Sequence, residues 1–340
     1  MGDALQRAWL RRGALARVLW PLSLVFGSLA ALRRLGFRAG WFKRTRLPVP
    51  VIVVGNVVAG GSGKTPVVIA VVHHLRSRGI HAGVVSRGYG RAGNSCQEVA
   101  ATSDARDVGD EPLLIARGCG VPVFVAPARA DAAHALLAAH PRVQVVVCDD
   151  GLQHYALARD IEICVFDDRG IGNGWLLPAG PLREAWPRHA DLVLRTHGAT
   201  GIEGHLVRRH ISSTAVRGDG AKRPLDELRS KRALIAVAGI ARPEAFFDML
   251  RAQQMKLVRT VALPDHAADA DYGSLLAAIP PDATLVCTEK DAVKLWKHRP
   301  DAWAVPLEVE IAPGFWREFD ALLQPLLDAK LSSGHGSQTA

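Results

Sequence analysis

The chain has 340 residues, of which 49% are hydrophobic and 22% charged, and its formal net charge is +9. This composition excludes a disordered or fibrous chain and allows one large hydrophobic core or two smaller ones. The five cysteines are scattered without a C-x-x-C pair, which argues against disulfides and a zinc site and favours reduced thiols.

The N-terminal segment, residues 1–46, has ten Lys or Arg side chains and one acid, so it holds the whole positive excess of the chain. Fifteen uncharged residues lie between Arg17 and Arg33, fewer than the roughly 20 that span a bilayer. Flanking arginines and tryptophans predict a membrane-associated helix in the headgroup layer of anionic lipid. A helix packed on the protein's own core is the alternative, and a signal peptide is less favoured. Nucleic acid is not an expected partner, because the excess charge belongs to this segment.

Short apolar runs alternate with amphipathic stretches over residues 47–200, which predicts an α/β fold with a parallel sheet flanked by helices. The expected strands are 49–56, 81–86, 121–126, 143–148 and 161–166, and the expected helices are 66–78, 112–117 and 128–139.

A second α/β pattern follows a stretch of low periodicity, residues 199–231, which we interpret as a connection or irregular β structure. The expected strands are 233–240, 283–288 and 302–311, and the expected helices are 243–255, 289–297 and 314–328. The pattern predicts a smaller second α/β domain over 201–330. Residues 331–340 are small and polar, and we expect a disordered tail.

A glycine-rich loop, NVVAGGSGKTP over residues 56–66, connects the first predicted strand to the first predicted helix. This context is that of a P-loop, which binds triphosphate through main-chain N–H groups and a helix N-terminus. We expect Lys64 to reach the β and γ phosphates and Thr65 to bind Mg²⁺. The pattern G-x-x-x-x-G-K-[ST] is broken at its first glycine by Val58. The predicted nucleotide-binding residues are Gly60, Gly61, Ser62, Gly63, Lys64 and Thr65.

Two adjacent acids, Asp149 and Asp150, follow the apolar run 143–148. Ligands bind at the carboxyl ends of strands in open α/β sheets, and paired carboxylates there can hold Mg²⁺ directly or through water. An Asp-Asp-Gly turn after a strand is common, and the P-loop upstream is what favours the metal site. ATP and Mg²⁺ are therefore the expected cofactors.

Seven short motifs, taken together, resemble the tetraacyldisaccharide 4'-kinase family. They are GGSGKTP (60–66), SRGY (86–89), VGDEP (108–112), DDGLQH (149–154), LLPAGPLRE (176–184), PDH (264–266) and TEKDAVK (288–294). The resemblance implies a P-loop kinase that transfers the γ-phosphate of ATP to the 4'-hydroxyl of a tetraacylated glucosamine disaccharide 1-phosphate. It also implies action on a lipid A precursor at the cytoplasmic face of a Gram-negative inner membrane, and it implies that Val58 is tolerated.

The resemblance also implies roles for residues outside the loop. Asp110 matches the catalytic aspartate of the family, although alone it would be interpreted as the N-cap of a helix starting at Pro112. His266 matches a histidine that pairs with that aspartate, and Lys64 completes the predicted catalytic set. The predicted substrate-binding residues are Arg87, Tyr89, Glu111, Gln153, His154 and Arg183.

Two other classes of protein remain as alternatives at this point. A P-loop GTPase or metallochaperone-type ATPase would share the core, although the guanine-reading N-K-x-D or T-K-x-D motif does not match Thr288-Glu289-Lys290-Asp291. A membrane-surface protein with a vestigial nucleotide site is disfavoured by the intact Lys64, Thr65, Asp149 and Asp150. No obligate protein partner is evident.

Overall fold

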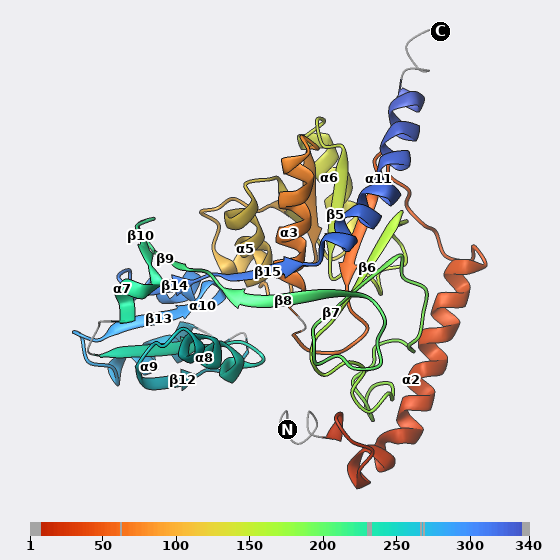
Figure 1. Ribbon diagram of the computed structural model, residues 1–340. Coiled ribbons are helices and arrows are strands. Elements are labelled where there is room, and N and C mark those ends of the chain that lie inside the picture. Colours follow the sequence, from red (N-terminus) through yellow and green to blue (C-terminus); the bar gives the residue numbers. More distant parts are fainter. Residues whose placement is uncertain (1–7, 62, 230–232, 266, 268, 335–340) are drawn as a thin grey trace.

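The computed structural model describes residues 8–61, 63–229, 233–265, 267 and 269–334, with the side chains of 269–270 and 330–334 left aside. These residues form two lobes, each built on its own sheet, and a long N-terminal helix stands beside the first lobe (Figure 1). The predicted α/β fold, with a parallel sheet and an N-terminal apolar helix, is confirmed.

The first lobe contains a nine-stranded sheet in the order β15-β8-β7-β6-β1-β5-β2-β4-β3. Its strands are β1 (Val51–Gly55), β2 (Ala82–Ser86), β3 (Gln97–Glu98), β4 (Val123–Val125), β5 (Val145–Asp149), β6 (Ile161–Phe166), β7 (Leu192–Arg195), β8 (His205–Ile211) and β15 (Leu307–Ile311). Its helices are α3 (Lys64–Ser77), α4 (Ala105–Val108), α5 (Asp110–Cys119), α6 (Arg129–Ala139) and α11 (Pro313–Gly334). The seven inner strands of this order, from β8 through β1 to β4, pair in parallel. The edge strands β3 and β15 are antiparallel to their neighbours.

Strand β1 lies in the middle of this sheet, between β5 and β6, and all five of its residues are buried. Successive side chains of a strand point to opposite faces, so Ile52 packs with α3 and α11 while Val53 packs with α6 on the other face. Burial on both faces explains the continuous apolar run. It also brings the carboxyl ends of β1, β5 and β6 to one edge.

The second lobe contains a six-stranded sheet in the order β10-β9-β14-β13-β11-β12. Its strands are β9 (Thr214–Arg217), β10 (Lys222–Pro224), β11 (Leu234–Ala238), β12 (Leu257–Ala262), β13 (Thr284–Thr288) and β14 (Trp303–Val305). Its helices are α7 (Leu225–Arg229), α8 (Pro243–Ala252), α9 (Asp269–Ala277) and α10 (Glu289–Leu295). Strands β12, β11, β13 and β14 are parallel, which matches the α/β pattern of the sequence.

Three segments that we assigned to the second domain belong to the first lobe instead, namely β8, β15 and α11. The predicted strand 302–311 is two strands, β14 in the second sheet and β15 in the first, where β15 pairs with β8 (Figure 1). Helix α11 then packs Phe315 and Phe319 into the core of the first lobe. The division at residue 200 therefore does not follow the sheets, because this antiparallel pairing joins residues about a hundred positions apart. Strands β3, β7 and β12 and helices α4, α7 and α9 were not predicted. The stretch 199–231, which we interpreted as a connection or irregular β structure, contains the strands β8, β9 and β10.

The expected disordered tail begins inside a helix, since α11 extends to Gly334. Residues 335–340 lie outside the described part of the chain.

Helix α2 (Ala14–Arg38) is the N-terminal helix, and most of its apolar side chains are exposed. It is held to the first lobe by polar contacts, such as the Ser23 hydroxyl, which donates to the Leu176 carbonyl at 2.8 Å. By length and composition, α2 is the one helix among the described residues that is long and apolar enough to cross a membrane. A core helix, which was the alternative, is excluded because only 11% of its apolar window is buried. The helix is longer than the uncharged run between Arg17 and Arg33.

Candidate functional site

The glycine-rich loop leaves β1 at Gly55 and enters α3 at Lys64. Gly60 and Gly63 adopt positive φ angles of 90° and 68°, which L-residues with a side chain rarely adopt, so the loop depends on glycine there. The buried Lys64 ammonium lies 3.5 Å from the Asn56 side-chain oxygen and 3.6 Å from an Asp150 carboxylate oxygen. Thr65 is buried at the first turn of α3, and Ser62 lies outside the described residues.

The departure of the loop from the P-loop pattern has a structural reason. Val58 is buried and forms an antiparallel bridge with Leu182. The Ala59 N–H donates to the Pro181 carbonyl at 2.7 Å, and the Arg183 N–H donates to the Val57 carbonyl at 2.7 Å. The first part of the loop is thus a strand-like segment. Its pairing with residues 181–183 places Arg183 at the site.

Asp149 and Asp150 lie at the carboxyl end of β5, opposite the loop. Asp149 is 1% exposed, and burial, followed by the charges of Glu111 and Asp150, raises its pKa to about 7. Burial also raises the pKa of Asp150, but Lys64 and Arg183 outweigh it and hold that pKa below the ordinary value. Two neighbouring carboxylates therefore have opposite shifts in pKa, as at many functional sites.

The acids fit a magnesium ion. Oxygen Oδ2 of Asp149 accepts from the Ser86 hydroxyl at 3.1 Å, while Oδ1 is buried without a hydrogen-bond partner among the described residues. Within the same described part, no cluster of three or more His, Cys, Asp or Glu side chains is present. Mg²⁺ is commonly held by one or two carboxylates with waters and substrate phosphates, so two acids suffice.

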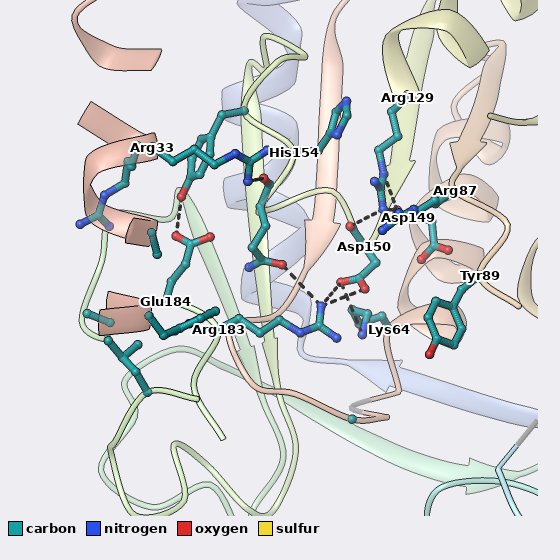
Figure 2. Close-up of a pocket in the computed structure, with 18 of the residues that line it drawn as sticks. Arg33, Lys64, Arg87, Tyr89, Arg129, Asp149, Asp150, His154, Arg183 and Glu184 are labelled. Carbon is teal, nitrogen blue, oxygen red and sulfur yellow. Dashed lines mark hydrogen bonds and ion pairs between the residues drawn. The ribbon is translucent and has the colours of Figure 1, made fainter. Parts of the chain in front are cut away.

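Two arginines fix the Asp149-Asp150 turn, and sequence reasoning missed one of them (Figure 2). Arg129, at the start of α6, donates to the Asp150 carbonyl at 2.6 Å and to the Asp149 carbonyl at 3.3 Å. Arg183 forms an ion pair with the Asp150 carboxylate at 3.0 Å. The left-handed φ of Asp150, 46°, is thus supported from both sides. Arg129 has no motif around it, and only its place after β4 could have indicated it.

One cavity of about 1060 Å³ joins the loop, the two acids and helix α2. Its polar end includes Lys64, Asp149 and Asp150, and its apolar end includes Phe26 and Leu29 of α2. The predicted substrate-binding residues that line it are Arg87, Tyr89, Glu111, Gln153, His154 and Arg183. A ligand with charged and acyl parts matches this division of the cavity.

Comparison with known proteins decides the family. The model of the tetraacyldisaccharide-1-P 4'-kinase (LpxK) family matches residues 15–324. The chain belongs to this family. A tetraacyldisaccharide 4'-kinase of Acidovorax sp. strain JS42 is 55% identical, over 98% of this chain and 97% of its own. One from Polaromonas naphthalenivorans is 53% identical over the full length of both. A crystal structure of LpxK from Aquifex aeolicus in complex with ATP has a TM-score of 0.78 and 27% identity, covering 92% and 99% of the two chains.

Membership of the tetraacyldisaccharide 4'-kinase family does not favour the GTPase or metallochaperone alternative. The Thr288–Asp291 motif has a structural part in the second lobe. The Asp291 carboxylate accepts from the Gly239 N–H at 2.9 Å and from the Tyr272 hydroxyl at 2.6 Å. Thr288 is the N-cap of α10 and accepts from the Asp291 N–H. The acid therefore fixes the β11–α8 loop.

Of the predicted catalytic residues Asp110 and His266, the structure describes only Asp110. Asp110 is 5% exposed at the first position of α5, so Gly109, and not Asp110, is the N-cap. Its carboxylate forms an ion pair with Lys294 of α10 at 3.0 Å, a contact between the lobes. Asp110 does not line the large cavity, whereas its neighbour Glu111 does. His266 lies outside the described residues.

Further polar side chains line the cavity. Gln153 donates to the Asn56 carbonyl at 3.1 Å, and its side-chain oxygen accepts from Arg183 at 3.4 Å. Burial, followed by the nearby arginines, lowers the pKa of His154 to about 4, so its imidazole is neutral at pH 7. The Tyr155 hydroxyl donates to Glu184 at 2.5 Å, and both line the cavity.

Proposed function

We propose that this chain is an ATP-dependent kinase that phosphorylates the 4'-hydroxyl of a tetraacylated glucosamine disaccharide 1-phosphate in lipid A biosynthesis. The observation that carries this proposal is the cavity in which a P-loop lysine and two strand-end acids meet the apolar face of α2. The cavity would provide a phosphate site for ATP and an apolar surface for the acyl chains of the lipid. The residues matched by the family model include the glycine-rich loop and all of α2 except Ala14.

The nucleotide is assigned to the glycine-rich loop. Main-chain N–H groups of residues 60–65 and the N-terminus of α3 would bind the triphosphate, and Lys64 would neutralise charge on the β and γ phosphates. Thr65, Asp149 and Asp150 would hold Mg²⁺, which when bound reduces repulsion between the phosphates and the incoming oxygen. Oxygen Oδ1 of Asp149, which is buried with no hydrogen-bond partner in the part of the chain that the structure describes, supports this assignment.

The acceptor is assigned to the space between the acids and α2. Asp110, which is next to the cavity-lining Glu111 but does not line the cavity itself, is proposed as the group that takes the proton of the 4'-hydroxyl, with His266 as its partner. This role requires the second lobe, whose Lys294 forms an ion pair with Asp110, to change its position on the first lobe. The basic and polar side chains are proposed to bind sugar and the 1-phosphate. They are Arg87, Tyr89, Glu111, Gln153, His154 and Arg183.

Helix α2 is proposed to attach the enzyme to the cytoplasmic face of the inner membrane. Its exposed apolar side chains and its arginines suit the boundary between acyl chains and anionic headgroups. Deleting residues 1–40 should move the protein from the membrane pellet to the supernatant. Unchanged partitioning would contradict this attachment.

The kinase assignment is tested with labelled γ-phosphate from ATP and the acylated disaccharide 1-phosphate in detergent. Wild-type protein should transfer label to the lipid, and Lys64→Ala should reduce transfer by about 10²-fold or more, as loss of a charged transition-state contact does. Lys222→Ala, on the exposed edge strand β10, is the matched control and should retain full transfer. No transfer by the wild-type protein, or a clear preference for GTP, would overturn the assignment.

A further inference from the structure

Arg169 lies in the loop after β6, and the site described above gives it no function. Its guanidinium lies between the glycine-rich loop and a buried acid. Nitrogen Nη1 donates to the Ala59 carbonyl at 3.2 Å, and Nη2 donates to the Gly61 carbonyl at 3.0 Å. The same guanidinium contacts the Asp167 carboxylate through Nη2 at 2.9 Å and through Nε at 3.0 Å. One planar group thus ties two carbonyls of the loop to a carboxylate.

The carboxylate is itself well fixed. Asp167 follows the last residue of β6, and its side chain is 1% exposed. It also accepts from the Arg169 N–H at 3.1 Å, which closes a tight turn between the two residues. Strand β6 pairs directly with β1, where Gly55 is opposite Cys164. Asp167 and the glycine-rich loop therefore leave neighbouring strands at the same edge of the sheet.

The direction of the carbonyls determines the direction of the N–H groups. In a trans peptide unit the C=O and the following N–H point opposite ways within one plane. When Arg169 binds the Ala59 carbonyl, the N–H of Gly60 is turned to the other side of the loop. A P-loop binds phosphate through such N–H groups. Hydrogen bonds from Arg169 to the loop carbonyls therefore favour the backbone orientation in which the N–H groups face the phosphate.

Gly60 makes room for this contact. Its φ is 90°, and a Cβ atom at this position would lie 3.2 Å from Nη1 of Arg169. The glycine is therefore needed for the backbone conformation and also for the approach of the guanidinium. The backbone conformation of Gly60 and the space next to it are thus both consistent with a contact between the loop and Arg169.

We propose that Arg169, anchored by Asp167, is a positioning residue that orients the glycine-rich loop for binding the phosphates of ATP. The proposal rests on the proposed function, since it assumes that the loop binds triphosphate. Arginine is required because its fork of N–H donors contacts two carbonyls and a carboxylate in one plane, whereas a lysine ammonium is a single point of contact.

The test compares ATP affinity and steady-state kinetics for Arg169→Ala and Arg169→Lys with those of the wild-type protein. Calorimetry with ATP and Mg²⁺, without lipid, should give a Kd at least tenfold higher for both variants. KM for ATP should rise by a similar factor, while KM for the lipid should stay within twofold. A residue needed only for folding would lower the amount of active protein and leave both KM values unchanged.

Arg299 provides a matched control in the second lobe. It contacts the Asp301 carboxylate through Nε at 2.8 Å and Nη2 at 2.9 Å, and it donates to the Ala283 carbonyl at 3.1 Å. Arg299→Ala removes the same kinds of contact away from the loop, so it should leave the Kd for ATP unchanged.

The outcomes separate the two proposals. ATP binding by the wild-type protein with a Kd for Arg169→Lys within twofold of it would overturn the positioning function and leave the proposed kinase intact. If the wild-type protein does not bind ATP, both fail. If Arg169→Ala does not fold, Arg169→Lys and Asp167→Asn decide, and normal ATP affinity in these two variants refutes the proposal.

Discussion

Replacing Asp149 with asparagine tests the electrostatics of the proposed metal site. Burial is the main cause that raises the pKa of Asp149 from 3.8 to about 7, with Glu111 and Asp150 adding to it. A difference of about 3 in pKa corresponds to about 4 kcal/mol. The free energy of unfolding is lower by this amount when the carboxylate is ionised and no metal is bound. The asparagine side chain of the variant would carry no charge, and its amide oxygen would still accept from Ser86.

The sign follows from the raised pKa. Ionised Asp149 destabilises the folded state, and this cost grows as the pH rises from about 4 to about 7 and is constant above. Asp149→Asn should therefore raise the free energy of unfolding at pH 8 by up to about 4 kcal/mol, and by less than half of that at pH 5. The same variant should lose stabilisation by Mg²⁺ with ATP and should lose phosphate transfer.

Urea unfolding in detergent with a chelator, at pH 8 and pH 5, measures this difference. Asp320→Asn in α11 is the matched control with the opposite sign. Burial raises the pKa of Asp320, but hydrogen bonds from His74 and Arg78 outweigh it and lower that pKa, so its replacement should destabilise the protein at pH 8. If Asp149→Asn is less stable than the wild type at pH 8, or if its gain is the same at both pH values, the reasoning is wrong.

Three further predictions concern the acceptor, the acid pair and the membrane. Asp110→Asn should lower kcat by roughly 10²- to 10⁴-fold with an unchanged Kd for ATP, and a near-normal kcat would remove it as the base. Arg183→Ala removes a charge that holds the pKa of Asp150 low, so the acid limb of the kcat/KM profile should move to higher pH. An unmoved limb would contradict that electrostatic coupling. Val18→Asp with Val25→Asp, at positions 74% and 59% exposed, should reduce binding to anionic vesicles at least tenfold without changing the unfolding midpoint.

The sequence alone predicted the proposed nucleotide end of the site, because the signals for it are local. The P-loop is read from one strand, its loop and the next helix, and Asp149 and Asp150 from the end of one buried run. The α/β class was equally readable, since alternating apolar runs and amphipathic stretches record burial directly. In these regions the pattern that identifies each residue lies within a few positions of it in the sequence, although its contacts come from distant segments.

Only the tertiary structure decided which distant segments meet. The Arg169 contact to Ala59 joins residues 110 positions apart, and the Lys294 contact to Asp110 joins residues 184 positions apart. The return of β15 and α11 to the first lobe and the cavity shared with α2 are of the same kind. Such contacts depend on strand order and on how the lobes and α2 pack, and the periodicity of a segment records that it is buried but not which partner buries it.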